Sequence, residues 1–379
     1  MNVVVVGGGV IGAASAWVLA SRGHAVTLLE QFGPGHKNGA SHGSSRIFRH
    51  AYADDYHVQL ASRAYTLWRE LEKSTNTELL TLTGAVDHGL PGTVTPRVDA
   101  LARGGLRSEV LSPAEAEKRW PGLRFDTTVL YHPDAGRLHA DRSVAAFTDA
   151  AQAAGATVDY GSAVREIRAT EVSTDTTTYS ADHIVVAAGA WTSTLVGAHV
   201  DLPSLVTTQE QPAHFLPTVD ADWPSFIHHP GAELRTEGIY GLLGEEGVKI
   251  GEHATGPVVH PDTRDFTPTP DGVERLKDYA RAWLPGVDAD SADPLTCLYT
   301  CTPDSNFVVD RTGNLTVAGG FSGHGFKFAP AIGELVADLV DGGVAPEVYR
   351  FTRPTSTRAG ATRAGATPAG ANVTFGHLK

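Results

Sequence analysis

The first thirty residues constrain the fold of this chain more than any other segment. Val3 to Val6 form a continuous apolar run, which is typical of a parallel strand buried on both faces. Gly7, Gly9 and Gly12 follow in the spacing G-x-G-x-x-G. In such a motif the first glycine permits a tight turn, the second lets the backbone approach a pyrophosphate, and the third lets a helix pack on the strand. The N-terminus of that helix offers N–H groups and a positive dipole end to phosphate oxygens.

A second strand and an acidic residue complete this pattern. Ala25 to Leu29 predict the second strand, and Glu30 ends it at close to the distance of about 20 residues at which an acid binds ribose hydroxyls. An acid there disfavours a 2′-phosphate, so FAD or NAD fits better than NADP. The pattern as a whole predicts a dinucleotide site, and a glycine-rich structural turn is the alternative.

Composition limits the partners of the chain. Its 379 residues suit two domains, and its formal net charge of −13 argues against nucleic acid or an anionic membrane as a partner. An anionic substrate would therefore need a local basic pocket. No apolar run approaches the roughly 18 residues of a membrane span, the two cysteines make no disulfide framework, and the first strand begins too early for a signal peptide. We expect a soluble, cytoplasmic protein.

Helix and strand patterns alternate along much of the chain. Apolar residues recur at helical spacing over 56–73 and 141–154, and Ser112-Pro113-Ala114-Glu115 is typical of a helix start with a serine cap. Further expected elements are strands at 156–160, 184–188 and 315–318 and an apolar helix around 332–339.

Between these pieces lie two stretches with strand-like patterning and many turns. We expect an α/β (α+β) fold in which they form one discontinuous substrate domain, built on a mainly antiparallel sheet and packed on a Rossmann-like nucleotide domain. An interface between two such domains is a usual place for a small-molecule pocket. The predicted nucleotide domain comprises residues 1–82, 141–204 and 297–353, and the predicted substrate domain comprises residues 83–140 and 205–296.

The last residues differ from the rest of the chain. RAGAT at 358–362 repeats at 363–367 and is followed by PAGAN at 368–372. Because large apolar residues are missing until Val373, we expect residues 354–379 to form a disordered tail.

Four segments together carry a resemblance to a known family. The first is the nucleotide motif, which many flavoproteins share. The others are HKNGASHGSSRIFRHAY at 36–52, YGLLGEEGVKIGEH at 240–253, and the stretch from TCLYT at 296–300 to GGFSGHGFKF at 319–328. In this order and approximate spacing over residues 1–350 they resemble the monomeric sarcosine oxidase and N-methyltryptophan oxidase family, which are FAD-dependent amine oxidases of the D-amino-acid oxidase superfamily.

The resemblance implies FAD as the cofactor, linked through its 8α position to a cysteine sulfur. The matching residue is Cys297, and a thiolate suits attack on that electrophilic carbon. A small buried apolar cysteine is the alternative. Cys301 departs from the family pattern, and we interpret it as a bystander to flavin attachment, with competition for the flavin as the alternative.

The resemblance also implies a pair of cations for the substrate carboxylate, Arg49 and Lys327. A planar guanidinium can grip a carboxylate by two parallel bonds, and an ammonium adds a compact point charge. Lys327 lies between Phe326 and Phe328 after a glycine turn, which argues against the alternative of a surface arginine and an unrelated lysine.

Lys249 and Arg46 match the basic residues that the family places near the flavin ring. Lys249 lies in the apolar context G-V-K-I-G, and in the family this lysine promotes the reaction of reduced flavin with oxygen. A positive charge there stabilises the negative charge that develops on oxygen. A lysine pointing outward from an edge strand is the alternative, and Arg46 could instead pair with a flavin phosphate or a nearby acid.

Further matching residues complete the pocket. By resemblance, Tyr240 and His253 would contact the substrate, and His324 would lie beside the flavin. No histidine pair has metal-ligand spacing, so we predict no metal. The other residues expected to bind the cofactor are Ser44, Ser45, Gly323 and Gly325, and Lys327 belongs to both the cofactor and the substrate set.

These features predict an FAD-dependent oxidase of secondary amino acids, N-methyl or cyclic, that releases an imine or aldehyde and hydrogen peroxide. A flavin dehydrogenase with a non-oxygen acceptor and a primary amino-acid oxidase of the glycine or D-amino-acid type are the alternatives. A flavin-binding protein without turnover and an NAD-linked dehydrogenase fit less well. The partners would be a small amino acid or amine and oxygen, and the resemblance suggests a monomer. The loop between Tyr240 and Lys249 looks shorter than in the sarcosine enzymes and carries Glu245 and Glu246, so the amine substituent stays open.

Overall fold

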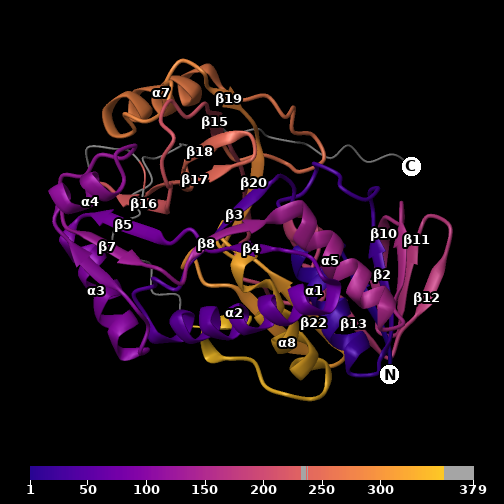
Figure 1. The fold of residues 1–379 in the computed structure, drawn as a ribbon. Helices are drawn as coiled ribbons and strands as arrows, with labels where there is room; N and C mark the ends of the chain where they lie inside the picture. Colours follow the sequence, from indigo (N-terminus) through magenta and orange to yellow (C-terminus); the bar gives the residue numbers. More distant parts are fainter. Residues whose placement is uncertain (232–235, 237, 354–379) are drawn as a thin grey trace.

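Two large sheets dominate the computed structural model, which describes residues 1–231, 236 and 238–353. The predicted disordered tail at 354–379 lies outside the described residues. Helix α7 (Pro270–Trp283) lies at the top of Figure 1, whereas α2 (Asp55–Thr75) and α8 (Ala329–Val340) lie at the bottom. The sheets therefore lie between two helical layers.

The nucleotide end of the molecule is a six-stranded sheet in the order β21-β22-β13-β1-β2-β9. All neighbouring strands are parallel except β21 and β22, which form an antiparallel hairpin. The strands predicted at 156–160, 184–188 and 315–318 are confirmed, with ends that differ by one or two residues. The six strands are β1 (Asn2–Val6), β2 (Ala25–Glu30), β9 (Thr157–Tyr160), β13 (His183–Val186), β21 (Val308–Thr312) and β22 (Leu315–Gly319).

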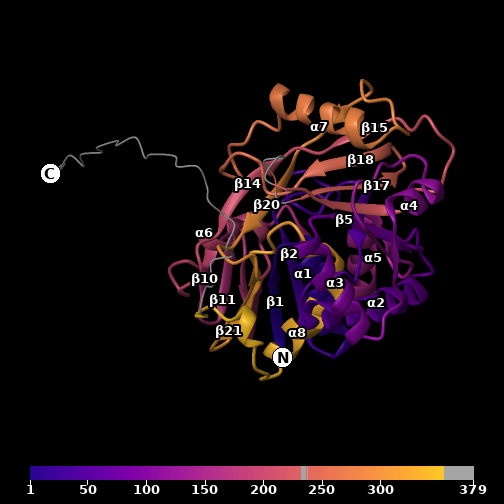
Figure 2. The ribbon, with the colours of Figure 1, turned by 90° about the vertical axis from the view of Figure 1, so that its left-hand side faces the viewer.

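Both faces of this sheet are buried, which explains the unbroken apolar runs in its strands. Val3 and Val5 lie in one apolar cluster with residues of α1 and α8, whereas Val4 and Val6 belong to a cluster on the opposite face. Figure 2 shows α1 and α8 on one side of β1, and β10 and β11 on the other. The covering elements are α1 (Val10–Ser21), α5 (Ala140–Ala153) and α8 on one face, and α6 (Thr192–Val196), β10 (Val164–Arg168), β11 (Glu171–Thr174) and β12 (Thr178–Ser180) on the other.

The second sheet has eight strands in the order β19-β15-β18-β17-β16-β5-β7-β6. Neighbours pair antiparallel except β16 and β5, so the expected mainly antiparallel sheet is present. The domain boundaries themselves stay a prediction. The strands are β5 (Ala85–Gly89), β6 (Glu109–Leu111), β7 (Val129–His132), β15 (Ala213–Phe215), β16 (Ser225–His229), β17 (Ile239–Gly244), β18 (Gly247–Glu252) and β19 (Asp293–Pro294).

Alternation along the strands decides which side chains of this second sheet share a face. Asp87 pairs with Ile227, and Ile227 pairs with Tyr240, so these three side chains form one row across the sheet. His229 lies two residues beyond Ile227 and shares that face. Lys249 lies two residues before the β18 partner of Tyr240 and shares it too. One face of the sheet therefore gathers several ionisable side chains.

Besides the expected α4 (Pro113–Arg119), two described helices fall inside stretches that the sequence predicts to be rich in strands: α3 (Pro91–Arg103) and α7. Each has a proline in its first turn, where the missing N–H is not needed. Thr269 also caps α7 by accepting a hydrogen bond from the Gly272 N–H at 3.3 Å. The pair Thr269-Pro270 is thus a helix-start signal that periodicity alone does not reveal.

The predicted helices are present with small shifts at their ends. The pattern over 56–73 corresponds to α2, and the pattern over 141–154 corresponds to α5. The capping box expected at Ser112 and Glu115 begins α4 (Pro113–Arg119). The helix expected around 332–339 is α8, which begins three residues earlier.

Two smaller sheets carry residues of the candidate site. An antiparallel pair joins β14 (Val206–Glu210) to β20 (Cys297–Cys301). A three-stranded sheet has the order β3-β8-β4, and β3 begins at Ser45. Its strands are β3 (Ser45–Phe48), β4 (Leu80–Thr81) and β8 (Gly136–His139).

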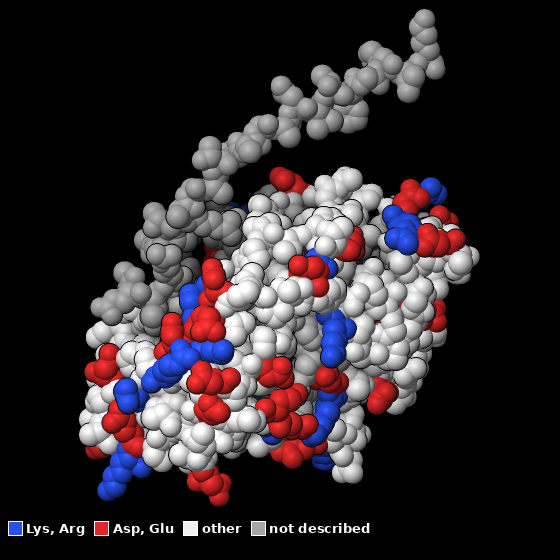
Figure 3. Space-filling model, turned by 90° about the horizontal axis from the view of Figure 1, so that it is seen from above, with Lys and Arg blue, Asp and Glu red and all other residues white. Residues whose placement is uncertain are grey.

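The visible surface carries charges of both signs. On the face seen in Figure 3, acidic and basic side chains are intermixed and form no broad basic area. Among the described residues, no helix combines the length and apolar character needed to cross a bilayer.

Gly12 tests the close packing of α1 on the turn that follows β1. A Cβ at this position would lie 1.8 Å from the Gly7 carbonyl oxygen, so the backbone must move apart. We expect Gly12→Ala to lower the free energy of unfolding by about 1–3 kcal/mol and to reduce the content of bound dinucleotide. Denaturant unfolding and the absorbance of the purified protein measure the two effects. Gly92→Ala is the control, because no atom lies within 4 Å of its added Cβ. Unchanged stability of Gly12→Ala would contradict the packing described here.

Candidate functional site

A cavity of about 1040 Å³ connects the glycine turn after β1 with the ionisable face of the second sheet. Segments far apart in the sequence meet in its walls. Of the predicted site residues, Gly12 and Ser44 lie outside the lining. Those that line it are Gly7, Gly9, Glu30, Ser45, Arg46, Arg49, Tyr240, Lys249, His253, Cys297, Gly323, His324, Gly325 and Lys327.

One end of the cavity is a backbone cradle. Gly7 has a φ of +104°, and a Cβ there would lie 2.5 Å from the Ala187 carbonyl oxygen. Gly9 precedes α1 and brings no side chain to cap the helix, while the Val10 N–H donates to Ser41 Oγ at 3.0 Å. The turn therefore accepts only glycine and presents a helix N-terminus at the cavity wall. Such a cradle suits a pyrophosphate.

Glu30 lies beside this cradle in a fixed position. The residue is 5% exposed, and its Oε2 accepts a hydrogen bond from the Gly8 N–H at 2.7 Å. Its Oε1 accepts from the Phe32 N–H at 2.9 Å and lies 3.4 Å from His36 Nε2. The carboxylate that the sequence assigns to a ribose is thus held at the end of β2, against the glycine turn.

The Arg46 guanidinium is held by backbone carbonyl groups. Its Nη2 donates to the Ala40 and His42 carbonyl oxygens, each at 2.8 Å, and its Nη1 donates to the Ser45 carbonyl oxygen at 2.8 Å. Ser45 Oγ is buried and has no hydrogen-bond partner among the described residues. A cation without a carboxylate partner and an unpartnered hydroxyl in one wall suit a polar, anionic ligand.

Ser44, by contrast, points away from the cavity lining. Its Oγ donates to Glu246 Oε2 at 2.5 Å, so it fastens the turn between β17 and β18. Glu246 belongs to the acidic pair that the sequence places in the loop before Lys249. The predicted contact of Ser44 with the cofactor stays a prediction.

Lys249 is buried in the wall of the cavity. It lies on β18, which runs between β15 and β17, so the alternative of an edge strand is wrong. Its ammonium donates to the Ser45 carbonyl oxygen at 3.3 Å. Burial and the nearby Arg46 lower the pKa of Lys249 to about 7, against the opposing attraction of Cys297 and Glu246. The side chain therefore changes charge near neutral pH.

Cys297 begins β20 and is partly exposed. Its Sγ lies 3.7 Å from the Ala40 carbonyl oxygen and 3.8 Å from Arg46 Nη2. A guanidinium and a carbonyl oxygen thus lie near the sulfur, and these polar surroundings differ from those of an inert apolar cysteine. Cys301 ends the same strand and lies outside the cavity lining.

Lys327 is held by a chain of hydrogen bonds. Its Nζ donates to Tyr52 Oη at 2.9 Å and to the His324 carbonyl oxygen at 2.8 Å. His324 Nε2 lies 3.1 Å from the Ser305 carbonyl oxygen, which can only accept, so this nitrogen carries the proton. His324 Nδ1 then accepts from the Tyr52 hydroxyl at 3.3 Å. The chain fixes the lysine and the neutral tautomer of the histidine together.

Arg49 and Lys327 both lie near the ring of Tyr52. The Arg49 Cζ lies 4.7 Å and the Lys327 Nζ 5.5 Å from the ring centre. Burial, with Arg49 adding to it, lowers the pKa of Lys327 well below its usual range. Because the two cations raise each other's cost of burial, an anion that enters the cavity between them would be stabilised.

Two predicted substrate-contacting residues lie on the second sheet. Burial raises the pKa of Tyr240 to about 12, so its hydroxyl stays protonated. His253 follows β18, and its backbone N–H donates to the Gly238 carbonyl oxygen at 2.8 Å. Its ring centre lies 5.4 Å from that of Tyr299. Both residues line the cavity, as do residues of the glycine turn at 320–325.

That second glycine turn is sterically constrained. Gly323 has a φ of +77°, and a Cβ there would lie 2.1 Å from the ring of Tyr299. A Cβ at Gly325 would lie 2.6 Å from Phe321. Only glycine therefore fits at both positions, which brings the backbone of the turn to the cavity.

The sequence does not single out a second polar cluster in the cavity wall. Asp87 is fully buried, and its Oδ1 lies 2.7 Å from His229 Nε2, 3.5 Å from Arg49 Nη1 and 3.6 Å from Arg97 Nε. Although burial favours the neutral acid, these neighbours hold the pKa of Asp87 well below its usual range. His229 and Arg97 line the cavity. The sequence offers one indication of this cluster, which is an acid inside the strand A-V-D-H-G. A fully buried aspartate is rare and needs partners.

A parallel sheet that ends in a glycine cradle, an acid beside it and buried cations beyond it define a dinucleotide-binding protein that takes an anionic small molecule. Residues 2–339 match the FAD dependent oxidoreductase family, named DAO, and the chain belongs to this family. FAD is thus the expected dinucleotide, as the sequence resemblance implied.

Individual relatives cover nearly the whole chain. The monomeric sarcosine oxidase of Bacillus sp. (strain NS-129) is 34% identical over 361 residues, which are 90% of this chain and 93% of that protein. The N-methyl-L-tryptophan oxidase of Citrobacter koseri is 28% identical over 359 residues, which are 90% of this chain and 95% of that protein. The solved structure of NikD, an unusual amino acid oxidase essential for nikkomycin biosynthesis, has a TM-score of 0.79 at 28% identity and covers 89% of this chain and 93% of its own.

No group of three or more histidine, cysteine or acidic side chains suited to a metal ion occurs within residues 1–231, 236 and 238–353. That the protein works without a metal stays a prediction.

Proposed function

We propose that the protein is an FAD-dependent oxidase of secondary amino acids, N-methyl or cyclic, with oxygen as the electron acceptor. The observation that carries this proposal is the pair of cations, the buried Lys327 and the partly buried Arg49, that both lie beside Tyr52 in the cavity that begins at the dinucleotide turn. Relatives named for sarcosine and N-methyl-L-tryptophan support the same substrate class. The monomeric state and the cytoplasmic location expected from the sequence stay predictions.

The residues of the cavity fit FAD. Gly7, Gly9 and the N-terminus of α1 would hold the pyrophosphate, Glu30 would bind a ribose, and the unpartnered Ser45 Oγ would meet a polar atom of the ligand. When bound, FAD would supply the redox chemistry: the substrate would lose two electrons and two protons to become the imine, and oxygen would gain two electrons and two protons to become hydrogen peroxide. The protein supplies binding, orientation and charge.

Arg49 and Lys327 would bind the substrate carboxylate. The guanidinium can grip it by two parallel bonds, and the ammonium adds a third donor. A bound carboxylate stabilises the charged form of Lys327 and so reverses the effect of burial on its pKa. Losing one partner of such a buried pair costs about 2–5 kcal/mol, so both cations are needed. Tyr240 and His253 would close the pocket around the rest of the substrate.

Lys249 and Arg46 would provide positive charge for the reaction with oxygen. Both are held by backbone carbonyl groups, which leaves their charge largely uncompensated in the cavity wall. Preorganised charge of this kind favours a transition state in which negative charge grows on oxygen.

The first test is to mix the purified yellow protein with sarcosine without air. We expect the visible flavin band to bleach and to return, with hydrogen peroxide, when air enters. Slow return of the band together with fast reduction of an added dye would favour a dehydrogenase. No bleaching with sarcosine, N-methyltryptophan or a cyclic imino acid would overturn the proposal, and bleaching with glycine alone would favour a primary amino-acid oxidase.

Lys249→Met should slow the reoxidation of the flavin far more than its reduction. Wild-type reoxidation should also slow as pH rises above about 7, because the ammonium loses its proton there, and the variant should lack this dependence. Stopped-flow absorbance measures both half-reactions. Lys118→Met, at an exposed position of α4, is the matched control. Equal slowing of reduction and reoxidation would argue against the role assigned to Lys249.

Cys297 is proposed to carry the flavin covalently. After denaturation in acid, we expect the yellow colour to stay with wild-type protein and with Cys301→Ser. In Cys297→Ser the colour should leave with the small-molecule fraction, because a hydroxyl is a far weaker nucleophile than a thiolate. Retention of colour by Cys297→Ser, or its loss from Cys301→Ser alone, would overturn the assignment.

A further inference from the structure

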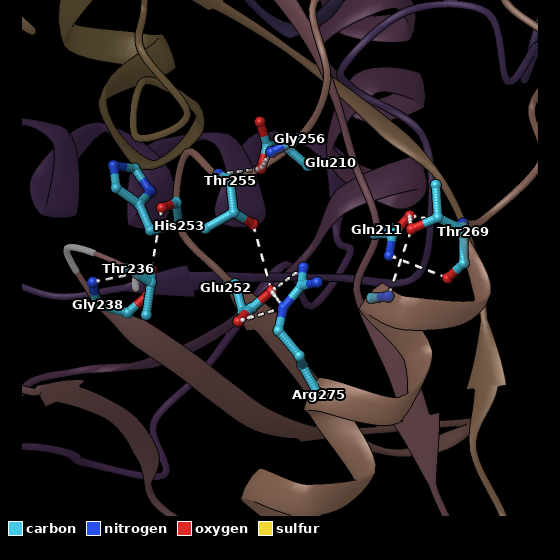
Figure 4. A network of polar contacts seen from close by, with 11 residues as sticks. Glu210, Gln211, Thr236, Gly238, Glu252, His253, Thr255, Gly256, Thr269 and Arg275 are labelled. Carbon is cyan, nitrogen blue, oxygen red and sulfur yellow. Dashed lines mark hydrogen bonds and ion pairs between the residues drawn. The ribbon is translucent and has the colours of Figure 1, made fainter. Parts of the chain in front are cut away.

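Glu210 is an enclosed carboxylate that the proposed reaction does not use. It ends β14 and is 1% exposed. Its Oε1 accepts a hydrogen bond from Thr208 Oγ1 at 2.6 Å, and its Oε2 accepts from the backbone N–H groups of Thr255 at 3.1 Å and Gly256 at 3.2 Å (Figure 4). Burial raises the pKa of Glu210. Taking an acid out of water is costly, so its hydrogen bonds must repay a large desolvation.

The two backbone donors belong to a strained turn. This turn follows β18 and begins with His253, which lines the cavity. The next residue, Ala254, has a φ of +57°, a left-handed conformation that costs a non-glycine residue about 1–2 kcal/mol. Thr255 and Gly256 come directly after it, so Glu210 holds the backbone where the strain is located.

Further contacts hold the turn from other directions. Thr236 Oγ1 lies 3.1 Å from the His253 carbonyl oxygen and 2.9 Å from the Gly238 carbonyl oxygen, so its single proton bonds one of them or is shared between both. On the outer side, Arg275 Nη2 lies 2.8 Å from Glu252 Oε2. Figure 4 shows Glu210 and the pair of Glu252 and Arg275 on different sides of the turn. The inner contact and the outer ion pair can therefore be removed separately.

Strand pairing connects Glu210 to the proposed flavin attachment. In the antiparallel pair of β14 and β20, Glu210 lies opposite Cys297 and Thr208 lies opposite Tyr299. Side chains directly opposite in such a pair share a face, with Cβ atoms about 4.5–5.5 Å apart. The ring of His253 is 5.4 Å from the ring of Tyr299. Glu210 thus lies where the strand of Cys297 meets the turn of His253.

We propose that Glu210 is a positioning residue: its carboxylate ties the turn of His253 to β14, and so sets His253 against the substrate. Without this contact the turn relaxes from its left-handed conformation, and the His253 ring moves relative to Tyr299 and Cys297. The inference rests on the proposed function, because it takes His253 as a residue that contacts the substrate.

Hydrogen exchange tests the contact itself, without any catalysis. Glu210→Leu removes both acceptor oxygens, whereas Glu210→Gln keeps an amide oxygen that can accept the two N–H bonds. In the flavin-containing protein we expect Glu210→Leu to speed exchange of the Thr255 and Gly256 amides by about tenfold or more, with Glu210→Gln close to wild type. Unchanged exchange in Glu210→Leu would overturn the proposal.

Ligand binding and reduction test the positioning. The probe is (methylthio)acetate, in which sulfur replaces the amine of sarcosine, and its binding is followed by the flavin spectrum. We expect Glu210→Leu to weaken this binding and to slow reduction by sarcosine by up to about 100-fold, since small misplacements can cost that much. Glu210→Gln should restore most of both. The matched control is Glu252→Gln, which removes the charge of the outer ion pair with Arg275, while its amide oxygen can still accept the 3.4 Å hydrogen bond from Thr255 Oγ1, and which should match wild type.

A double-mutant cycle separates positioning from general stability. If Glu210 acts through His253, then Glu210→Leu adds little to the loss already caused by His253→Ala. Additive losses, or an equal loss in Glu252→Gln, would overturn the proposal. If Glu210→Leu does not fold, Thr208→Val replaces it, because it removes only the 2.6 Å bond, and the same pattern is expected with smaller size. A wild-type flavin that no secondary amino acid reduces would overturn the proposed function, while the exchange result would still decide whether Glu210 holds the turn.

Discussion

The candidate site depends on cations that are buried against neutral acceptors. Arg46 and Lys249 donate to backbone carbonyl oxygens of the loop and strand at residues 40–45. Lys327 donates to a carbonyl and a tyrosine hydroxyl. Carbonyl groups satisfy the N–H donors but do not cancel the charge. The cavity wall is therefore preorganised for anions, although the chain as a whole carries a net charge of −13. The charge of the cavity wall is thus opposite in sign to that of the whole chain, so an acidic protein can still bind an anionic ligand.

The strand register of the second sheet decides which side chains form the cavity wall. Because every second residue faces the cavity, the single pairing of Ile227 with Tyr240 also fixes Asp87, His229 and Lys249 on that wall. A slip of one residue would turn all of them away together. The residues that alternate with them, such as Phe226, Val248 and Ile250, face the other side of the sheet and pack in its apolar core. The register that buries the apolar side chains is thus also the register that places the ionisable side chains in the site.

Parts of this arrangement could be predicted from the sequence, and others could not. The strand–turn–helix unit at residues 1–30 has a local pattern in which each residue type has a steric or electrostatic reason, and the structure confirms it. Arg49 and Lys327 were predicted from the family resemblance, and both line the same cavity. Asp87 and Glu210 were not predicted, since each is a lone acid in an ordinary strand. Their surroundings exist only after distant strands pair, and no spacing in the sequence records that pairing.

The order of strands in the nucleotide sheet has a consequence for biosynthesis. The dinucleotide motif is made before most of the strands that complete its sheet, because β1 is flanked by β13, and β13 in turn by β22, which ends at Gly319. Non-local pairing of this kind folds slowly and leaves unpaired strand edges exposed in the meantime. Cys297 and Lys327 also arrive late on the ribosome. The cavity is lined by residues 7–9 and by residues 320–327, so its wall is complete only after both segments have been made.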